Sequence, residues 1–286
     1  WLNLVKCRRW RGFGWLLFLG YTMHFPAEAL SSDPARAQAS LDMFLMADVL
    51  QCIGVSIGIV QLMAQFAKKA RTVVIGAGLL AVGFVAMAPL ADAVPYDHWG
   101  RPLANYLTHR GGSLFPLFPW SGFVMAGVSL TFLVAPQGAK TDPWVPVPRL
   151  LGLAALLFGV HVLAKASPWT FVTDATTSHS VPHFAILKLA AVVGVVVVLS
   201  LIGTRLRSLP QWLQTLAGES LMLYWFHLML LYGAGLGLAS VVGRTLPLTE
   251  ALLAAGAVVV VTVLVGLGWH RAKRWKNDVR ARRAIP

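Results

Sequence analysis

The chain has 286 residues, of which 57% are hydrophobic and 12% are charged, and its mean hydropathy is +0.68. These values exclude a water-soluble enzyme, a disordered chain and a collagen-like chain. The net charge of +13 does not indicate nucleic-acid binding, because the basic residues lie beside apolar segments rather than on a soluble surface. The two cysteines, Cys7 and Cys52, offer no disulfide framework. The composition therefore predicts a membrane protein.

Eight apolar segments are long enough to cross a bilayer, which takes about 17 helical residues or more. They run approximately over residues 13–30, 43–66, 72–94, 114–135, 147–165, 183–203, 213–238 and 246–269. Lipid offers the backbone no hydrogen-bond partner, and the segments are continuous rather than alternating, so we expect helices and not a β-barrel. The predicted fold is all-α, a polytopic integral membrane bundle of about eight helices, with a single domain over residues 1–286.

The lysines and arginines predict the orientation of this bundle. Of the 24, 18 fall in one set of connections, five fall in the other set, and Lys188 lies inside a span. Because such residues collect on the cytoplasmic side, we expect both termini in the cytoplasm. Residues 1–12 then form a basic lead-in, and residues 270–286 form a basic tail near anionic lipid. The chain begins with Trp1, and we expect further sequence upstream of it.

The second span carries two polar side chains, Asp48 and Gln51, three residues apart on one helical face. Polar groups inside hydrocarbon are costly and usually face a cavity or a partner. A carboxylate beside an amide is typical of a general base or a substrate clamp, and equally of a hydrogen-bonded tie between helices. Both interpretations stay open at this point.

The seventh span holds the densest polar set. Ser220, Tyr224 and His227 follow an i, i+4, i+7 spacing and form one stripe, with Glu219 on an adjoining face. A histidine titrates near physiological pH, so His227 is a candidate general base. The alternative is a buried histidine that donates one hydrogen bond to a neighbouring helix.

Other polar residues fall in the outer half of the membrane under this orientation. His161 lies in the fifth span, and His183 and Lys188 lie at the start of the sixth. Lys188 can extend its ammonium group to the interface without any functional role. No pair of histidines has the short helical spacing of a metal motif, so we predict no metal site.

The fourth span begins with two prolines, Pro116 and Pro119. Proline disfavours regular helix in the turn where it lies, so the segment should either enter the membrane bent or begin its helix at Pro119. A bent entry would form the wall of a site, because freed carbonyl groups need protein or water to cover them.

Four stretches resemble the bacterial relatives of heparan-α-glucosaminide N-acetyltransferase, within the wider set of transmembrane acyltransferases. They are Arg-Arg-Trp-Arg-Gly at 8–12, Ala-Asp-Val-Leu-Gln-Cys-Ile-Gly at 47–54, Phe-Pro-Leu-Phe-Pro-Trp at 115–120 followed by Gly122 and Gly127, and Gly-Glu-Ser-Leu at 218–221 with Tyr224 and His227. Members of this family usually open with an Asp-x-x-Arg-Gly motif followed by a histidine, which is not present here. We therefore expect either a truncated sequence or a degenerate member.

The resemblance implies an enzyme of the bacterial inner membrane that moves an acyl group, such as acetyl, from acyl-CoA to a hydroxyl or amine of a sugar. The site residues implied are His227 as the base, oriented by Glu219 or Asp48, and Gln51, Trp120, Tyr224 and His161 around the acyl group or sugar. Basic residues near the cytoplasm would meet the CoA phosphates, namely Arg205, Arg207, Lys68 and Lys69.

Two other functions remain possible from the sequence. One is a non-catalytic membrane subunit or scaffold of a larger assembly, which the missing opening motif favours. The other is a small-molecule or lipid transporter, in which the bent fourth span and Asp48 would take part in gating. The expected partners are the bilayer, a glycan acceptor, and membrane proteins or further copies of the chain.

Overall fold

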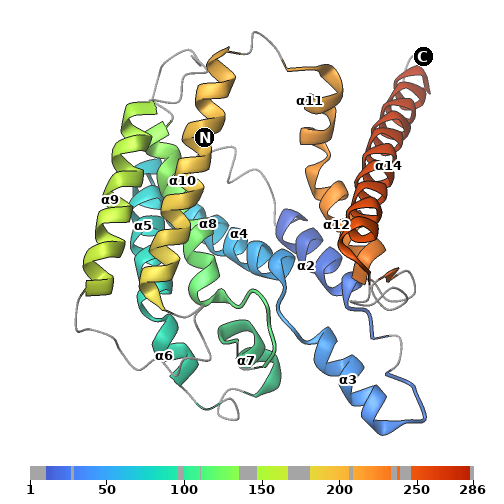
Figure 1. Ribbon diagram of the computed structural model, residues 1–286, viewed down its shortest axis with the longest axis horizontal. Coiled ribbons are helices and arrows are strands. Elements are labelled where there is room, and N and C mark those ends of the chain that lie inside the picture. The colour runs from blue at the N-terminus through green and yellow to red at the C-terminus, as the bar shows by residue number, and fades with distance from the viewer. Residues whose placement is uncertain are drawn as a thin grey trace. The chain divides into compact units, whose positions relative to one another are not determined.

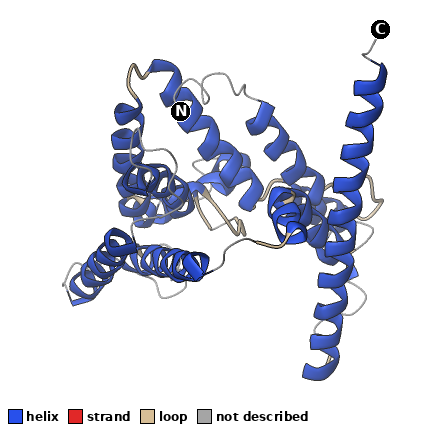
Figure 2. Ribbon diagram, turned by 90° about the horizontal axis from the view of Figure 1, so that it is seen from above, coloured by secondary structure: helices blue, strands red, loops and turns tan. Residues whose placement is uncertain are grey.

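The computed structural model describes residues 11–26, 29–93, 95, 100–109, 111–134, 147–166, 181–205, 209–232, 237–238 and 246–283. Over these residues the chain forms helices and no strand (Figure 2). The helices are α2 (Arg11–Met23), α3 (Pro34–Phe44), α4 (Val49–Phe66), α5 (Ala70–Ala86), α6 (Ala88–Ala93), α7 (Arg101–Leu107), α8 (Leu117–Val134), α9 (Val147–Ala166), α10 (Pro182–Arg205), α11 (Gln211–Gly218), α12 (Ser220–Tyr232) and α14 (Leu248–Arg283). The predicted all-α class is confirmed.

The helices have the length and composition of a membrane protein. Four described stretches are long and apolar enough to cross a bilayer, namely Pro34–Phe66, Val147–Ala166, Pro182–Gly203 and Leu248–Val279. Four shorter apolar helices are Gly12–Met23, Ala70–Ala86, Leu117–Thr131 and Ser220–Tyr232. All eight coincide in order with the predicted spans. The number of membrane passes and the orientation of the termini remain predictions.

Backbone contacts divide the chain into two compact units. Unit 1 contains the described part of Trp1–Tyr21 together with Leu41–Arg205, and unit 2 contains Thr22–Ser40 and Leu206–Pro286. Each unit is described by itself below. The single domain over residues 1–286 stays a prediction.

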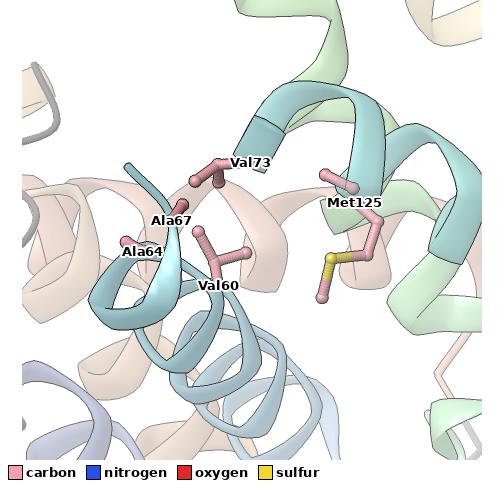
Figure 3. Close-up of a cluster of buried hydrophobic side chains, with 6 residues drawn as sticks. Val60, Ala64, Ala67, Val73 and Met125 are labelled. Atoms are coloured by element: carbon pink, nitrogen blue, oxygen red, sulfur yellow. The ribbon is translucent and has the colours of Figure 1, made fainter. Parts of the chain in front are cut away.

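The core of unit 1 lies where α4, α5 and α8 meet. Its buried apolar side chains come from all three helices (Figure 3), and they are Val60, Ala64, Ala67, Val73, Ala77 and Met125. The helices α5 and α8 make extensive contact with each other, as do α9 and α10 (Figure 1). The helix α8 also contacts α6 and α10.

The close approach of α5 and α8 requires a glycine at position 122. A Cβ atom there would lie 3.0 Å from Val85 Cγ2 and 3.1 Å from the backbone oxygen of Ala81. At Gly127, on the same helix, a Cβ atom would meet no atom within 4 Å. We expect Gly122→Val to destabilise the protein by about 1–3 kcal/mol through overpacking.

Gly127→Val is the matched control, since it makes the same change in helix propensity on the same helix. Thermal unfolding in detergent measures both variants. The expected result is a clearly lower Tm for Gly122→Val and a smaller change for Gly127→Val. Equal shifts would contradict the close packing of α5 against α8.

Unit 2 is built around α14, which packs against α11 and α12. A Cβ atom at Gly266 would meet the side chain of Leu223, so the surface of α14 is close to α12 at this point. The eighth predicted span, 246–269, continues as one helix through the basic tail to Arg283. The first part of the predicted tail is therefore helical, and it carries His270 and Lys273 to α11 and α12.

Three predicted spans are interrupted. The third breaks at Met87, directly before a short helix with Pro89 in its first turn, where the missing N–H is tolerated. The fourth has non-helical angles at Phe118 (φ −98°, ψ 119°), so its regular helix starts at Pro119, as one of the two interpretations expected. The seventh breaks at Glu219 (φ −105°, ψ 16°), where α11 ends after Gly218 and α12 begins.

Candidate functional site

Asp48 lies at the N-terminus of α4 and not inside the helix, which corrects the sequence-based placement. Its backbone is extended (φ −108°, ψ 179°), and its Oδ1 accepts a hydrogen bond from the Val49 N–H at 2.6 Å. Aspartate is favoured at this position because its oxygen satisfies an exposed backbone donor and its charge complements the helix dipole. The side chain is buried, with 7% of the residue exposed.

Three hydrogen bonds hold the turn before α4 in place. The backbone N–H of Ala47 donates to Ser113 Oγ at 3.0 Å, and the N–H of Phe115 donates to the Ala47 carbonyl at 3.2 Å. The side-chain amide of Asn105 donates to the Leu45 carbonyl at 3.0 Å. The carboxylate at the start of α4 is therefore fixed by α7 and by the segment that leads into α8.

The helix α4 carries buried polar side chains beyond its first residue. Ser56 Oγ donates to Ser121 Oγ of α8 at 2.9 Å. Gln51 is fully buried, and a Cβ atom at Gly20 of α2 would lie 2.6 Å from its side-chain amide. Within the described residues neither polar atom of that amide has a hydrogen-bond partner. An unpaired buried amide costs about 1–3 kcal/mol. The predicted contact of Gln51 with substrate stays a prediction.

A histidine and a carboxylate that the sequence analysis did not pair meet in unit 1. Asp92 of α6 is 7% exposed, and its Oδ1 accepts the backbone N–H of His109 at 3.3 Å. His109 Nδ1 lies 4.0 Å from Asp92 Oδ2. Trp120 of α8 donates its indole N–H to His109 Nε2 at 3.2 Å. We call Asp92, His109 and Trp120 the His109 cluster.

The hydrogen bond from Trp120 fixes the tautomer of a neutral His109. Indole nitrogen can only donate, so Nε2 of His109 carries the lone pair and Nδ1 carries the proton. That Nδ1 lies 4.0 Å from Oδ2 of the buried Asp92, within ion-pair distance and longer than a hydrogen bond. A carboxylate in this position orients the imidazole and stabilises the imidazolium that forms when Nε2 takes a proton.

Trp120 also has a cation and two aromatic rings around it. The Lys188 ammonium lies 4.8 Å from the centre of the Trp120 ring, a cation–π contact. The rings of Phe115 and Phe123 lie 4.8 Å and 5.6 Å from it. The predicted pocket residue Trp120 therefore stands between a candidate base and a positive charge.

His161 joins α9 to α10. Its Nδ1 lies 2.8 Å from the carbonyl oxygen of His183, and because a carbonyl can only accept, Nδ1 carries the proton. The two imidazole rings lie 5.5 Å apart. This hydrogen bond accounts for the burial of His161. Its predicted contact with substrate stays a prediction.

Tyr106 of α7 makes a hydrogen bond to another helix of unit 1. Its hydroxyl lies 2.8 Å from the hydroxyl of Tyr21 on α2. Burial, and then this hydrogen bond, raises the pKa of Tyr106 well above its usual range. The hydroxyl therefore stays neutral and acts as a tie rather than as an acid.

In unit 2 the predicted polar stripe lies on α12. His227 Nδ1 lies 3.0 Å from the backbone oxygen of Leu223, so Nδ1 donates and the lone pair is left on Nε2. The ring of Tyr224 meets the His227 ring edge-on at 5.4 Å. The geometry suits a base, and the role stays a prediction.

Glu219 lies between α11 and α12 and is paired with α14. Lys273 Nζ lies 2.8 Å and 3.0 Å from its two carboxylate oxygens, and His270 Nδ1 lies 3.3 Å from Oε1. Glu219 is 8% exposed, so these charges stabilise an ion that burial alone would destabilise. Its described contacts therefore join α14 to the start of α12. Its predicted orientation of His227 stays a prediction.

The sequence-predicted site residues fall into both units. Unit 1 holds Asp48, Gln51, Trp120, His161 and Arg205, and unit 2 holds Glu219, Tyr224 and His227. Arg207 lies outside the described residues, and Arg205 is exposed in the last turn of α10. The predicted orientation of His227 by Asp48 involves one residue from each unit and stays a prediction. In the described ranges no group of three or more His, Cys, Asp or Glu side chains is placed to hold a metal ion.

The sequence analysis missed Asp92 and the role of His109, although one signal was present. Asp92 falls inside the predicted third span, 72–94, and an acidic residue inside hydrocarbon indicates a partner or a site. His109 lies 17 residues further on, after α7, so neither helical spacing nor a motif connects the two. A search that paired each acid within a span with the histidines of the following loop would have found them.

The comparison with known families decides what this arrangement resembles. The catalytic region of heparan-alpha-glucosaminide N-acetyltransferase matches residues 34–165. These residues are acetyltransferase-like. The resemblance predicted from the sequence is therefore confirmed over this region, and it indicates a membrane acetyltransferase. No curated protein and no solved structure was found to match the chain.

The acetyltransferase-like region, residues 34–165, includes the His109 cluster and four residues chosen from the sequence. These are Asp48, Gln51, Trp120 and His161. His227 and Glu219 lie after the matched residues. The match therefore favours unit 1 as the place to look for the reacting groups.

Proposed function

We propose that the protein is a membrane acetyltransferase that moves an acetyl group from acetyl-CoA to a hydroxyl or amine of a sugar. The match of residues 34–165 to the acetyltransferase catalytic region carries this proposal. The partly buried His109 cluster inside the matched region supports it, because acetyl transfer needs a positioned base. The proposed setting is a bacterial inner membrane, with both termini in the cytoplasm.

The reaction requires one proton to move from the acceptor to the leaving group. The base takes the proton from the acceptor O–H or N–H as that oxygen or nitrogen attacks the thioester carbonyl carbon. The carbonyl oxygen becomes negative in the tetrahedral intermediate and needs a hydrogen-bond donor. The carbon–sulfur bond then breaks, and the base returns the proton to sulfur, which gives acetylated sugar and free CoA.

His109 is our first candidate for the base. Its Nε2 accepts a hydrogen bond from the Trp120 N–H at 3.2 Å, which is long for a hydrogen bond. The hydroxyl of the sugar can replace the indole as the donor to Nε2. Asp92 then stabilises the imidazolium through Nδ1. The indole N–H of Trp120, once displaced, is a donor for the developing oxyanion.

His227 is the second candidate, as proposed from the sequence. Its Nε2 carries a lone pair, and its Nδ1 is held by Leu223. In this version Asp48 or Glu219 orients the base, and Gln51, Tyr224 and His161 contact the acceptor or the acyl group. The two candidates lead to different mutational results, which are set out in the Discussion.

Basic residues at one end of unit 1 support the proposed site for the CoA phosphates. Lys68 and Lys69 precede α5, and Arg205 ends α10. The cavity is lined by residues between 81 and 86, at the end of α5, and between 182 and 189, at the start of α10. The start of α5 and the end of α10 therefore both lie away from this cavity. Arginine and lysine bind phosphate oxygens through charge-assisted hydrogen bonds.

A coupled assay tests the proposed function. The full chain in proteoliposomes is given acetyl-CoA with and without an added glycan, and released CoA thiol is measured. We expect glycan-dependent thiol release. Transport predicts movement of the glycan without acetyl-CoA, and a scaffold predicts neither result, so each outcome separates this proposal from the alternatives.

A further inference from the structure

A second feature of unit 1 is an apolar cavity beside the His109 cluster. It has a volume of about 370 Å³ and lies among α5, α8, α9 and α10. All thirteen lining residues are apolar, and they include Phe123, Leu157 and Val160. A cavity of this size is within the range of small-molecule sites, about 300–1,000 Å³. Its lining provides no group that would hold the sugar or the CoA phosphates.

One wall of the cavity connects it to a positive charge. Phe123 lines the cavity and packs on Trp120, and the Lys188 ammonium lies over the same Trp120 ring. Lys188 sits on α10 between the lining residues Ile186 and Leu189. The apolar cavity is therefore connected through Phe123 to Trp120, and Trp120 contacts both Lys188 and His109.

Two helices that line the cavity, α9 and α10, have exposed apolar surfaces. Both α9 and α10 are long and apolar enough to cross a bilayer. Their outer side chains are exposed, for example Leu163 (72%) and Leu199 (60%). In a bilayer these exposed side chains would contact hydrocarbon, which matches the apolar lining of the cavity.

We propose that this cavity holds the hydrocarbon chain of a membrane-anchored acceptor, an anionic lipid that carries the sugar. This inference rests on the proposed function. The donated acetyl group has no chain to fill the cavity, so the chain belongs to the acceptor. Lys188 pairs with the anionic head group, and the sugar beyond that head group then lies beside Trp120 and His109.

Photocrosslinking tests the occupant directly. The full chain is placed in phosphatidylcholine nanodiscs that contain a small fraction of phosphatidylglycerol with a diazirine in its acyl chain, and the labelled residues are mapped by mass spectrometry. Ala126 and Ala185 line the cavity and are buried, so they are labelled only if a chain enters. We expect both to be labelled. Labels confined to exposed residues such as Leu199 would overturn the proposal.

Matched variants show whether the chain occupies this cavity. Val160 lines the cavity, whereas Val162 lies on the same helix, is similarly exposed, and does not line it. We expect Val160→Trp to reduce labelling of Ala126 and Ala185 at least fivefold, and Val162→Trp to leave it unchanged. Ile186→Trp fills the cavity from α10 in case Val160→Trp fails to fold. Equal labelling in the filled and control variants would overturn the proposal.

The charge of the head group is tested with a second probe. Phosphatidylcholine with the same diazirine chain has no net charge, so we expect it to label Ala126 and Ala185 several-fold less than the phosphatidylglycerol probe. Lys188→Gln should remove that preference. Equal labelling by both probes in the unmodified protein would overturn the assignment of an anionic lipid.

The labelling is measured without acetyl-CoA, so the test of the lipid site does not depend on acetyl transfer. Cavity labelling in a protein that transfers no acetyl group would leave the lipid site standing and overturn its assignment to an acceptor. Acetyl transfer without cavity labelling would overturn the lipid site and support the proposed function.

Discussion

His109→Ala should lower the rate of acetyl transfer by about 10²–10⁴-fold, the usual contribution of a positioned general base. The effect should fall on kcat more than on KM, because the lost proton transfer takes place in the transition state. Asp92→Asn should give a loss of similar direction, since an amide cannot stabilise the imidazolium as a carboxylate does. The rate is measured as glycan-dependent release of CoA from proteoliposomes.

Trp120→Phe tests the proposed oxyanion donor. It keeps an aromatic ring beneath Lys188 and removes the N–H that donates to His109. We expect a loss of about 10²–10³-fold in kcat, because the base remains and one donor to the oxyanion is removed. If His109→Ala folds with unchanged yield and keeps the wild-type rate, then His109 is not the base.

The sequence-based assignment makes a competing prediction for His227 and Asp48. In that assignment His227→Ala and Asp48→Ala abolish acetylation of an added glycan and leave the folded yield intact. One base is enough for the reaction, so we expect the full loss in one histidine variant and not in both. Wild-type turnover in His227→Ala and Asp48→Ala would remove these residues from the site.

The structure sharpens the test at Asp48. Asp48→Ala also removes the oxygen that accepts from Val49 at the start of α4, which costs about 0.5–2 kcal/mol. Asp48→Asn keeps a hydrogen-bond acceptor at this position and removes the charge. A catalytic carboxylate therefore predicts that Asp48→Asn is as inactive as Asp48→Ala, whereas a cap predicts that Asp48→Asn is active and stable.

The membrane-spanning character of the chain could be predicted from the sequence because it depends on the length of apolar runs. Each of the eight predicted spans has an apolar helix at its place. The breaks at Met87 and Glu219 could not be predicted in the same way. The run of apolar residues continues through Met87, and the partners of Glu219 are His270 and Lys273, more than fifty residues away.

Residues of the candidate site could be predicted only where they belong to a recognisable motif. Trp120 and Asp48 were named from stretches that resemble the acetyltransferases, and both lie in the matched region. The partners of Trp120 could not be named, because His109 and Lys188 reach it from a loop and from another helix. Asp48 was placed inside a helix because hydropathy gives the extent of an apolar run and not the residue where the helix begins.

The most direct test of the account follows the acetyl group itself. Proteoliposomes of the full chain are incubated with acetyl-CoA labelled with carbon-13 in its acetyl group and with an added glycan, and the products are weighed by mass spectrometry. We predict a glycan that gains one labelled acetyl group, with an equal amount of CoA released. Unchanged glycan and intact acetyl-CoA, in the presence of folded protein, would contradict the account.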